Sequence, residues 1–146
     1  MRLLIRPLKL LDSLELYKLF KLRVDVFVVE QKCPYQEIDN KDIDAIHIYL
    51  KDDDNIAAYL RVLPPGLSYK EASIGRVLVS KEYRGKGYGR QLMQEGIKYC
   101  NSHYSVSIKI SAQAYLEDFY KGLGFEKISE MYLEDNIPHI DMIYNN

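Results

Sequence analysis

The apolar positions of this chain follow a helical period in some segments and alternate as in strands in others. Leu16 and Leu19 lie on one helical stripe, and Asp12 is placed to cap the start of a helix. Together they predict a helix over 13–28. Arg23 lies on the same apolar stripe, where a charged side chain needs either a partner or a function.

Alternating and apolar segments elsewhere predict strands, and turn-forming residues separate them. The predicted strands are 2–8, 43–50, 56–63, 72–80, 105–112, 125–133 and 137–144. The remaining predicted helices run from the glycine-rich turn at 85–89 to about residue 101, and over 114–123. Gly124 is placed to end the last helix in a left-handed conformation. The order β-α-β-β-β-α-β-α-β-β predicts a mixed α/β fold without regular Rossmann alternation.

The composition is typical of one soluble domain. The chain has 146 residues, 47% of them hydrophobic, which suffices for one core over 1–146. A formal net charge of −1 gives no field to attract nucleic acid or an anionic membrane. No apolar run could cross a bilayer and no signal peptide is present, so we expect a cytoplasmic protein. The two cysteines, Cys33 and Cys100, suit a reducing compartment.

The strongest chemical signal is a glycine-rich turn between a predicted strand and a predicted helix. Three glycines lie at 85, 87 and 89, and Arg84, Lys86 and Arg90 add positive charge around them. Glycines let a ligand approach the backbone, and the free N–H groups of the first helical turn attract anions. The segment therefore predicts a phosphate site, the alternative being a plain turn with solvated basic side chains. Both the Walker pattern and the dinucleotide glycine pattern are absent.

Two motifs resemble the GNAT superfamily of acetyl-CoA-dependent N-acetyltransferases. Arg84-x-x-Gly87-x-Gly89, after a strand that reads RVLVS, is similar to the pyrophosphate-binding motif of that superfamily. The segment 111–125, SAQAYLEDFYKGLGF, resembles its second motif, a strand and then a helix ending FYxxxGF. The segments VFVVEQKCPYQEID, IGRVLVS and EDNIPHIDM narrow the resemblance to the ElaA-type branch. The resemblance implies a mixed, mostly antiparallel sheet of about seven strands flanked by helices, with acetyl-CoA as cosubstrate and no metal.

The resemblance also implies roles for individual residues. Backbone N–H groups of 85–90 would hold the pyrophosphate, and backbone groups of Val77 and Val79 would hold the pantetheine arm and polarise the thioester carbonyl. Tyr120 would be the catalytic residue, donating toward the departing sulfur, although its apolar stripe also fits a core tyrosine with a buried hydroxyl. The residues expected at acetyl-CoA are Val77, Val79, Arg84, Gly85, Lys86, Gly87, Tyr88, Gly89, Arg90 and Gln113.

The acceptor end of the site is less defined. By analogy with the superfamily, the helix at 13–28, the polar loop at 33–42 and the last two strands would build it. The residues expected to bind the acceptor are Arg23, Glu30, Tyr35, Glu37, His47 and His139, with Asp39 nearby. Acidic groups there would favour a cationic amine, but a solvated loop would have the same composition.

No single residue stands out as the general base. Ser73 occupies the position where some members of the superfamily carry glutamate, and Glu71 lies two residues before it. The other candidates are Glu30, Glu37, His47 and His139, of which the histidines could equally be structural. A metal site built from Cys33, Cys100, His47, His103 and His139 is a weak interpretation, because no second close pair completes a tetrahedron.

These observations lead to one main hypothesis and two rivals. The main one is an N-acetyltransferase that moves an acetyl group from acetyl-CoA to a primary amine of a small molecule or peptide. It needs no nucleic acid or membrane partner, and the superfamily leaves a homodimer open. The first rival is an acyl-CoA-binding regulatory module without turnover, which Ser73 favours and Tyr120 disfavours. The second rival is a partner-binding domain with no CoA site.

Overall fold

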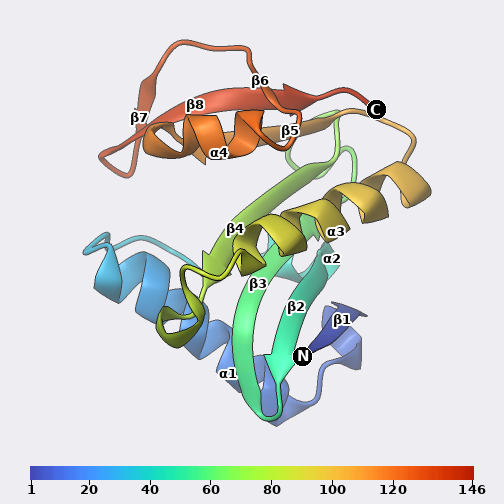
Figure 1. Ribbon diagram of the computed structural model, residues 1–146, viewed down its shortest axis with the longest axis vertical. Coiled ribbons are helices and arrows are strands. Elements are labelled where there is room, and N and C mark those ends of the chain that lie inside the picture. The colour runs from blue at the N-terminus through green and yellow to red at the C-terminus, as the bar shows by residue number, and fades with distance from the viewer.

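The first of two sheets contains four antiparallel strands in the order β1-β2-β3-β4. The computed structural model describes residues 1–146, and these strands form the lower sheet in Figure 1. They are β1 (Arg2–Pro7), β2 (Ile46–Asp52), β3 (Asn55–Leu63) and β4 (Ser73–Val79). β3 is buried along nearly its whole length because both faces of the sheet are covered. All four strands predicted in this part of the chain are present, but the predicted start of the second at residue 43 is wrong, because residues 43 and 44 belong to a short helix, α2 (Lys41–Asp44).

The second sheet centres on the last strand, which pairs with three others. Its strands are β5 (Ile108–Gln113), β6 (Glu126–Lys127), β7 (Tyr132–Glu134) and β8 (Ile137–Tyr144). The predicted continuous strand over 125–133 is wrong, since β6 and β7 are two short pieces. Between them the Asp141 N–H donates to the Ser129 hydroxyl oxygen at 2.8 Å, so a side chain replaces the ladder carbonyl.

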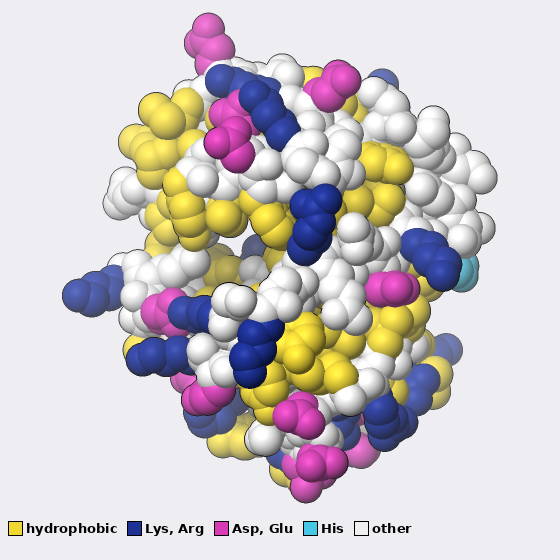
Figure 2. Space-filling view, in the orientation of Figure 1, with side chains coloured by type: hydrophobic (Ala, Val, Ile, Leu, Met, Phe, Trp, Pro, Cys, Tyr) yellow, Lys and Arg dark blue, Asp and Glu magenta, His cyan; other side chains and the backbone are white.

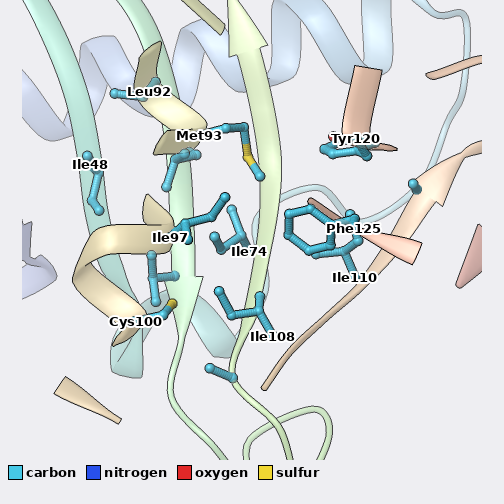
Figure 3. Packing of buried hydrophobic residues seen from close by; sticks show 14 of the residues in the cluster. Ile48, Ile74, Leu92, Met93, Ile97, Cys100, Ile108, Ile110, Tyr120 and Phe125 are labelled. Atoms are coloured by element: carbon cyan, nitrogen blue, oxygen red, sulfur yellow. The ribbon is translucent and has the colours of Figure 1, made fainter. Parts of the chain in front are cut away.

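Helices cover both faces of the first sheet (Figure 1). On one face α3 (Tyr88–His103) packs Leu92, Met93 and Ile97 into the larger core cluster, as Figure 3 shows. On the opposite face α1 (Ser13–Val24) packs Leu19 against Tyr59 in a smaller cluster. The short helical segments are η1 (Leu8–Leu10), α2 (Lys41–Asp44), η3 (Lys81–Tyr83), η4 (Ala114–Leu116) and α4 (Glu117–Lys121). None of the helices has both the length and the apolar character needed to span a membrane.

The first predicted helix changes its winding before it ends. After α1 the chain continues as a π-helical segment, η2 (Asp25–Glu30), in which the N–H of Gln31 reaches back to the carbonyl of Val26 at 3.2 Å. Such wide turns are rare and often occur at functional sites. The predicted helix over 114–123 is likewise split, into η4 and then α4. The chain after η2 is therefore redirected toward the junction of the two sheets.

The two sheets meet at one point and then separate. Ala72, just before β4, forms a single parallel bridge with Ile108 at the start of β5, and the Lys109 N–H donates to the Ala72 carbonyl at 2.8 Å. The larger core continues across this junction, where Ile110 of β5 and Tyr120 of α4 belong to the same cluster as the apolar side chains beneath α3 (Figure 3). The separation of β4 from β5 opens a cleft between the sheets.

Candidate functional site

A cleft lies between β4 and β5. It encloses about 580 Å³ and is lined by both strands, by η2, by η4 and by the turn between β7 and β8. Figure 2 shows the surface hollowed between the upper and lower halves of the molecule, with Lys and Arg side chains around the opening. Of the residues predicted for the site, those lining the cleft are Glu30, Tyr35, Val77, Val79, Arg84, Gln113, Tyr120 and His139.

A bulge in β4 determines which of its residues face the cleft. Arg76 and Val77 together oppose one residue of β3, Leu60, and Arg76 adopts a left-handed φ of +54°. The extra residue shifts the alternation of side chains. Val77 and Val79 therefore both pack against the core under α3, whereas Leu78 packs in the cluster under α1.

β4 presents a free backbone edge to the cleft. The Ser80 N–H donates to the Ala57 carbonyl of β3 at 2.8 Å, so Val79, one position earlier, directs its backbone groups away from β3. Consistently, the Val79 carbonyl accepts a hydrogen bond from Arg84 Nε at 2.9 Å. β5 does not pair with this part of β4. The edge can therefore accept an extended ligand by backbone hydrogen bonds.

The glycine-rich loop leads from this edge into the N-terminus of α3. Gly85 and Gly87 have φ of +80° and +82°, and a Cβ at either position would meet nothing within 4 Å. Glycine is thus required because the backbone is left-handed at these positions, and not because a side chain would collide with a neighbour. The N–H groups of residues 85–90 donate no hydrogen bond within the protein, the first helical bond being from Gln91 to the Gly87 carbonyl. This row of free donors at a helix N-terminus is an anion site.

The basic side chains near the loop have partners of their own. Arg84 donates from Nη1 and Nη2 to the Glu30 carboxylate, at 2.9 Å each, while its Nε bonds to Val79. Hydrogen bonding and charge from Arg84 lower the pKa of Glu30. Arg90 donates to a carbonyl after α4, and Lys86 lies over an aromatic ring at 5.9 Å. The free donors for an anion are therefore mainly backbone groups, and Glu30 is a weak proton acceptor.

Tyr120 reaches the cleft from the opposite side, on α4. The residue is 7% exposed, lines the cleft, and its hydroxyl forms no hydrogen bond within the protein. Burial raises the pKa of Tyr120 to about 12, and the nearby Tyr115 adds to this effect. The ring packs edge-on against Phe119 and Phe125. A neutral phenol with a free O–H in a cleft is suited to donate a hydrogen bond to a ligand.

Two polar groups on the second sheet complete the cleft wall. Gln113 donates from Nε2 to Oε1 of Gln31 at 3.3 Å, which links β5 to the chain after η2. His139 lies opposite Gln113 on β8, and its Nδ1 contacts the Ile137 carbonyl at 2.7 Å. Its Nε2 lies 3.4 Å from the carboxylate of Glu134, a cleft residue that sequence reasoning missed. This wall combines an amide, an imidazole and a carboxylate.

The structure places three predicted acceptor residues behind the cleft wall and not on it. Arg23, Glu37 and His47 are 0%, 3% and 0% exposed and do not line the cleft. Arg23 binds Glu37 at 2.8 Å and Asp42 at 2.7 Å, while His47 contacts the hydroxyl of Tyr59 at 2.6 Å. The polar loop at 33–42 is thus not solvated throughout, because its acidic side chains neutralise buried arginines. Burial removes these three residues from direct contact with an acceptor.

The remaining candidates for a general base and for a metal site do not lie together. Ser73 lines the cleft, whereas Glu71 does not. Cys33 lies at the cleft and donates from Sγ to the Asp135 carbonyl, while Cys100 is buried in the core beneath α3. The structure does not bring three histidine, cysteine or carboxylate side chains together in a group that could hold a metal ion.

Comparison with known proteins places this chain in a family. Residues 18–145 match the model of the acetyltransferase (GNAT) domain. Protein ElaA of Escherichia coli is 44% identical over 131 residues, which cover 88% of this chain and 86% of ElaA. The crystal structure of an acyl-CoA N-acyltransferase from Pseudomonas aeruginosa superimposes with a TM-score of 0.92 at 41% identity, covering 98% of both chains. The crystal structure of Escherichia coli ElaA gives the same TM-score at 39% identity, covering 99% of both chains. With its fold, its cleft and its two motifs in agreement, the chain belongs to the GNAT acetyltransferase family and is an enzyme of acyl-CoA-dependent acyl transfer.

Proposed function

We propose that this enzyme transfers an acetyl group from acetyl-CoA to a primary amine by direct attack within a ternary complex. The observation that supports this most strongly is the arrangement of three features along one continuous path. The free edge of β4 and the unpartnered hydroxyl of Tyr120 both lie at the cleft, and the row of free N–H groups at 85–90 follows directly after Arg84, which lines the cleft. They match the three parts of acetyl-CoA, namely the pantetheine arm, the pyrophosphate and the thioester.

In this proposal the backbone does most of the binding. The N–H groups of 85–90 hold the pyrophosphate at the positive end of α3, and the edge at Val77 and Val79 pairs with the pantetheine amides. A backbone N–H of the same edge donates to the thioester oxygen and stabilises the negative charge that develops there. Gln113, on the facing strand, is within the same cleft and contacts the arm.

The reaction then exchanges one bond for another. The neutral amine attacks the thioester carbonyl carbon, the C–N bond forms, and the C–S bond breaks with its electron pair leaving on sulfur. Because the pKa of Tyr120 is about 12 and that of a thiol is about 8.5, full proton transfer to the thiolate is uphill by roughly 5 kcal/mol. Tyr120 therefore stabilises the thiolate by a hydrogen bond without ionising.

The amine must also lose a proton, and the cleft has polar side chains that can bind the amine and accept this proton. Glu30, Tyr35 and His139 line the cleft, and we propose that they contact the acceptor. Of these, Glu30 is held as a carboxylate by Arg84 and Tyr35 donates to Glu37. We propose that the ring of His139, whose Nε2 lies 3.4 Å from the Glu134 carboxylate, accepts the proton that the amine nitrogen releases.

The experiment is thiol release from acetyl-CoA with a panel of primary amines, measured with a thiol reagent. The expected result is release that depends on the amine, together with a product heavier than the amine by one acetyl group. The control is acetyl-CoA with enzyme and no amine. Tight binding of acetyl-CoA with no release for any amine of the panel would contradict the proposal and favour the regulatory module.

A further inference from the structure

The bulge in β4 contains a backbone conformation that its residue does not favour. Arg76 has a φ of +54°, in the left-handed region that side chains with a Cβ rarely adopt. The other non-glycine residues with positive φ lie in turns or loops, whereas Arg76 lies inside a strand. Such a conformation persists only where the surroundings hold it in place, and it is typical of functional positions.

The side chain of Arg76 is held from two sides. Its Nε contacts the Glu37 carboxylate at 2.8 Å, and its Nη2 donates to the Glu37 backbone carbonyl at 3.2 Å. Its guanidinium also lies over the ring of Tyr35, 5.6 Å from the centroid. The phenol of Tyr35 in turn donates to the same Glu37 carboxylate at 2.5 Å. Arg76 is thus fixed in orientation by charge-assisted hydrogen bonds and by stacking.

The anchor for Arg76 is itself immobile. Glu37 is 3% exposed and also accepts hydrogen bonds from Arg23, which is fully buried and bound to Asp42. A second buried arginine, Arg61 of β3, joins the cluster through Asp42 and Asp39. Three guanidinium groups therefore face three carboxylates, and the cluster has no net charge. A neutral, closely bonded cluster of this kind gives Arg76 a rigid point of attachment.

We propose that Arg76 is a positioning residue for acyl transfer. Its side chain, clamped by Glu37 and Tyr35, holds the bulge that turns the backbone of Val77 toward the cleft, where an N–H can meet the thioester oxygen. Arg76 also lines the cleft, but its guanidinium hydrogen-bonds only to Glu37 and Asp39 and to no residue of the pyrophosphate loop. This inference rests on the proposed function, because it assigns the bulge to the thioester of acetyl-CoA.

The test compares the full-length enzyme with the variants Arg76→Gly, Arg76→Ala and Arg76→Lys. Acetyl-CoA labelled with carbon-13 at the acetyl carbonyl is the probe, since the resonance of this carbon reports hydrogen bonding to the carbonyl oxygen. Glycine accepts a φ of +54° without strain but lacks the clamp, whereas alanine lacks the clamp and is strained. Comparing the two separates backbone preference from side-chain anchoring. Affinity for free CoA, which has no thioester, controls for folding and for the pyrophosphate site.

We expect the bound carbonyl resonance of both Arg76→Gly and Arg76→Ala to return toward its position in free acetyl-CoA. The kcat should fall by about tenfold or more, while KM for acetyl-CoA and Kd for CoA stay within about twofold of wild type. Arg76→Lys, which can bind Glu37 with one hydrogen bond, should recover part of the shift of the carbonyl resonance and part of kcat. A wild-type carbonyl resonance and kcat in Arg76→Gly would overturn the proposal, as would an equal loss of CoA and acetyl-CoA affinity.

The two proposals fail in different ways in this experiment. If wild-type enzyme shifts the carbonyl resonance but no amine is acetylated, the proposed function fails and the role of the bulge in binding the thioester stands. If wild-type enzyme acetylates amines while Arg76→Gly behaves like wild type, the function stands and the positioning role fails. Tyr35→Phe, which removes one hydrogen bond to Glu37 and retains the stacking surface, should give a smaller effect of the same sign.

Discussion

Tyr120 occupies a position that satisfies both packing and chemistry. Its ring lies in the core between Phe119 and Phe125, while its hydroxyl is left without a partner in the protein and faces the cleft. A tyrosine buried only for packing would normally bond its hydroxyl to a neighbouring group. The free O–H therefore favours the functional interpretation of the FYxxxGF motif over the purely structural one.

Replacing this tyrosine should lower turnover without weakening the binding of acetyl-CoA. Tyr120→Phe retains the ring and removes the donor, so kcat should fall by roughly 10-fold to 150-fold, as expected for a hydrogen bond to a charged group of about 1.5–3 kcal/mol. Affinity for acetyl-CoA should stay within about twofold, because the sulfur is uncharged in the ground state. Steady-state kinetics and a binding titration check both values. Tyr17→Phe, at an exposed tyrosine of α1, is the control, and equal kcat values for the two variants would remove Tyr120 from the mechanism.

At this scale the assignment of individual residues to acetyl-CoA stays a prediction from the motifs, whereas the burial of side chains shows which acceptor candidates cannot contact a ligand. Arg23 was noted as a charge on an apolar stripe, and it proves to be fully buried with carboxylate partners. Arg61 and Arg76 interrupt apolar strands in the same way, which is a signal that the sequence offered. Their partner Asp39 is 22 and 37 residues away along the chain, so that only the fold brings the pairs together.

The end of α4 shows how a short element can fix a functional side chain. The N–H of Phe125 bonds to the Tyr120 carbonyl at 3.1 Å and that of Gly124 bonds to the Lys121 carbonyl at 3.0 Å. With Gly124 at a φ of +103°, this is the Schellman arrangement, and the accompanying apolar contact is between the rings of Tyr120 and Phe125. The left-handed end that the sequence predicted at Gly124 is confirmed.

A side chain at this glycine should destabilise the element. Gly124→Ala forces a left-handed alanine, which costs about 1–2 kcal/mol, and its Cβ would lie 3.0 Å from the ring of Tyr144. The free energy of unfolding should therefore fall by at least about 1 kcal/mol, measured by denaturant titration. Gly122→Ala, at an ordinary φ of −62°, is the matched control and should change stability far less. Equal stability of the two variants would refute the capping role.

Element boundaries were predicted less well than element types, for reasons visible in the structure. The change from α1 to η2 depends on where the chain must turn to reach the cleft. The break between β6 and β7 depends on Ser129 accepting a hydrogen bond from a distant strand. The bulge at Arg76 was also unpredicted, since its residue gives no local signal for a positive φ. Each feature is set by tertiary contacts that periodicity does not contain.

At the scale of the whole molecule, stability depends on pH because ionisable groups are buried or partly buried behind the cleft. They include His47 and the carboxylates that bind Arg23 and Arg61. Burial lowers the pKa of His47, which hydrogen-bonds Tyr59 and the Asp42 carbonyl. Burial by itself would raise the pKa of Asp42 and of Asp39. Arg23 and Arg61 lower the pKa of Asp42 overall, and Arg61 and Arg76 lower that of Asp39. In acid the native state thus binds fewer protons than the unfolded chain, and protonation favours unfolding.

The predicted pH profile follows from these signs. Stability from His47 is fully present above its unfolded pKa of about 6.5 and is lost as pH falls below it, by up to about 1.4 kcal/mol per pH unit. A second loss from the carboxylates begins as pH falls toward about 4. Thermal unfolding between neutral and acidic pH measures both steps. In His47→Gln, whose amide can replace both hydrogen bonds, the first step should shrink, and an unchanged profile would contradict the assignment.

The most direct measurement is the melting temperature of the protein with excess acetyl-CoA, compared with free CoA and with ATP. Ligand at about 100 times its Kd adds roughly 2.7 kcal/mol to the native state, which corresponds to a rise of about 5–10 °C in a domain of this size. We expect that rise with both CoA species and not with ATP. Gly87→Asp, which places a carboxylate among the free N–H groups, should abolish it, whereas Gly66→Asp, at a positive-φ glycine in the connection between β3 and β4, should retain it. An equal rise with ATP, or an undiminished rise in Gly87→Asp, would show that the loop at 85–90 is not the site of acetyl-CoA.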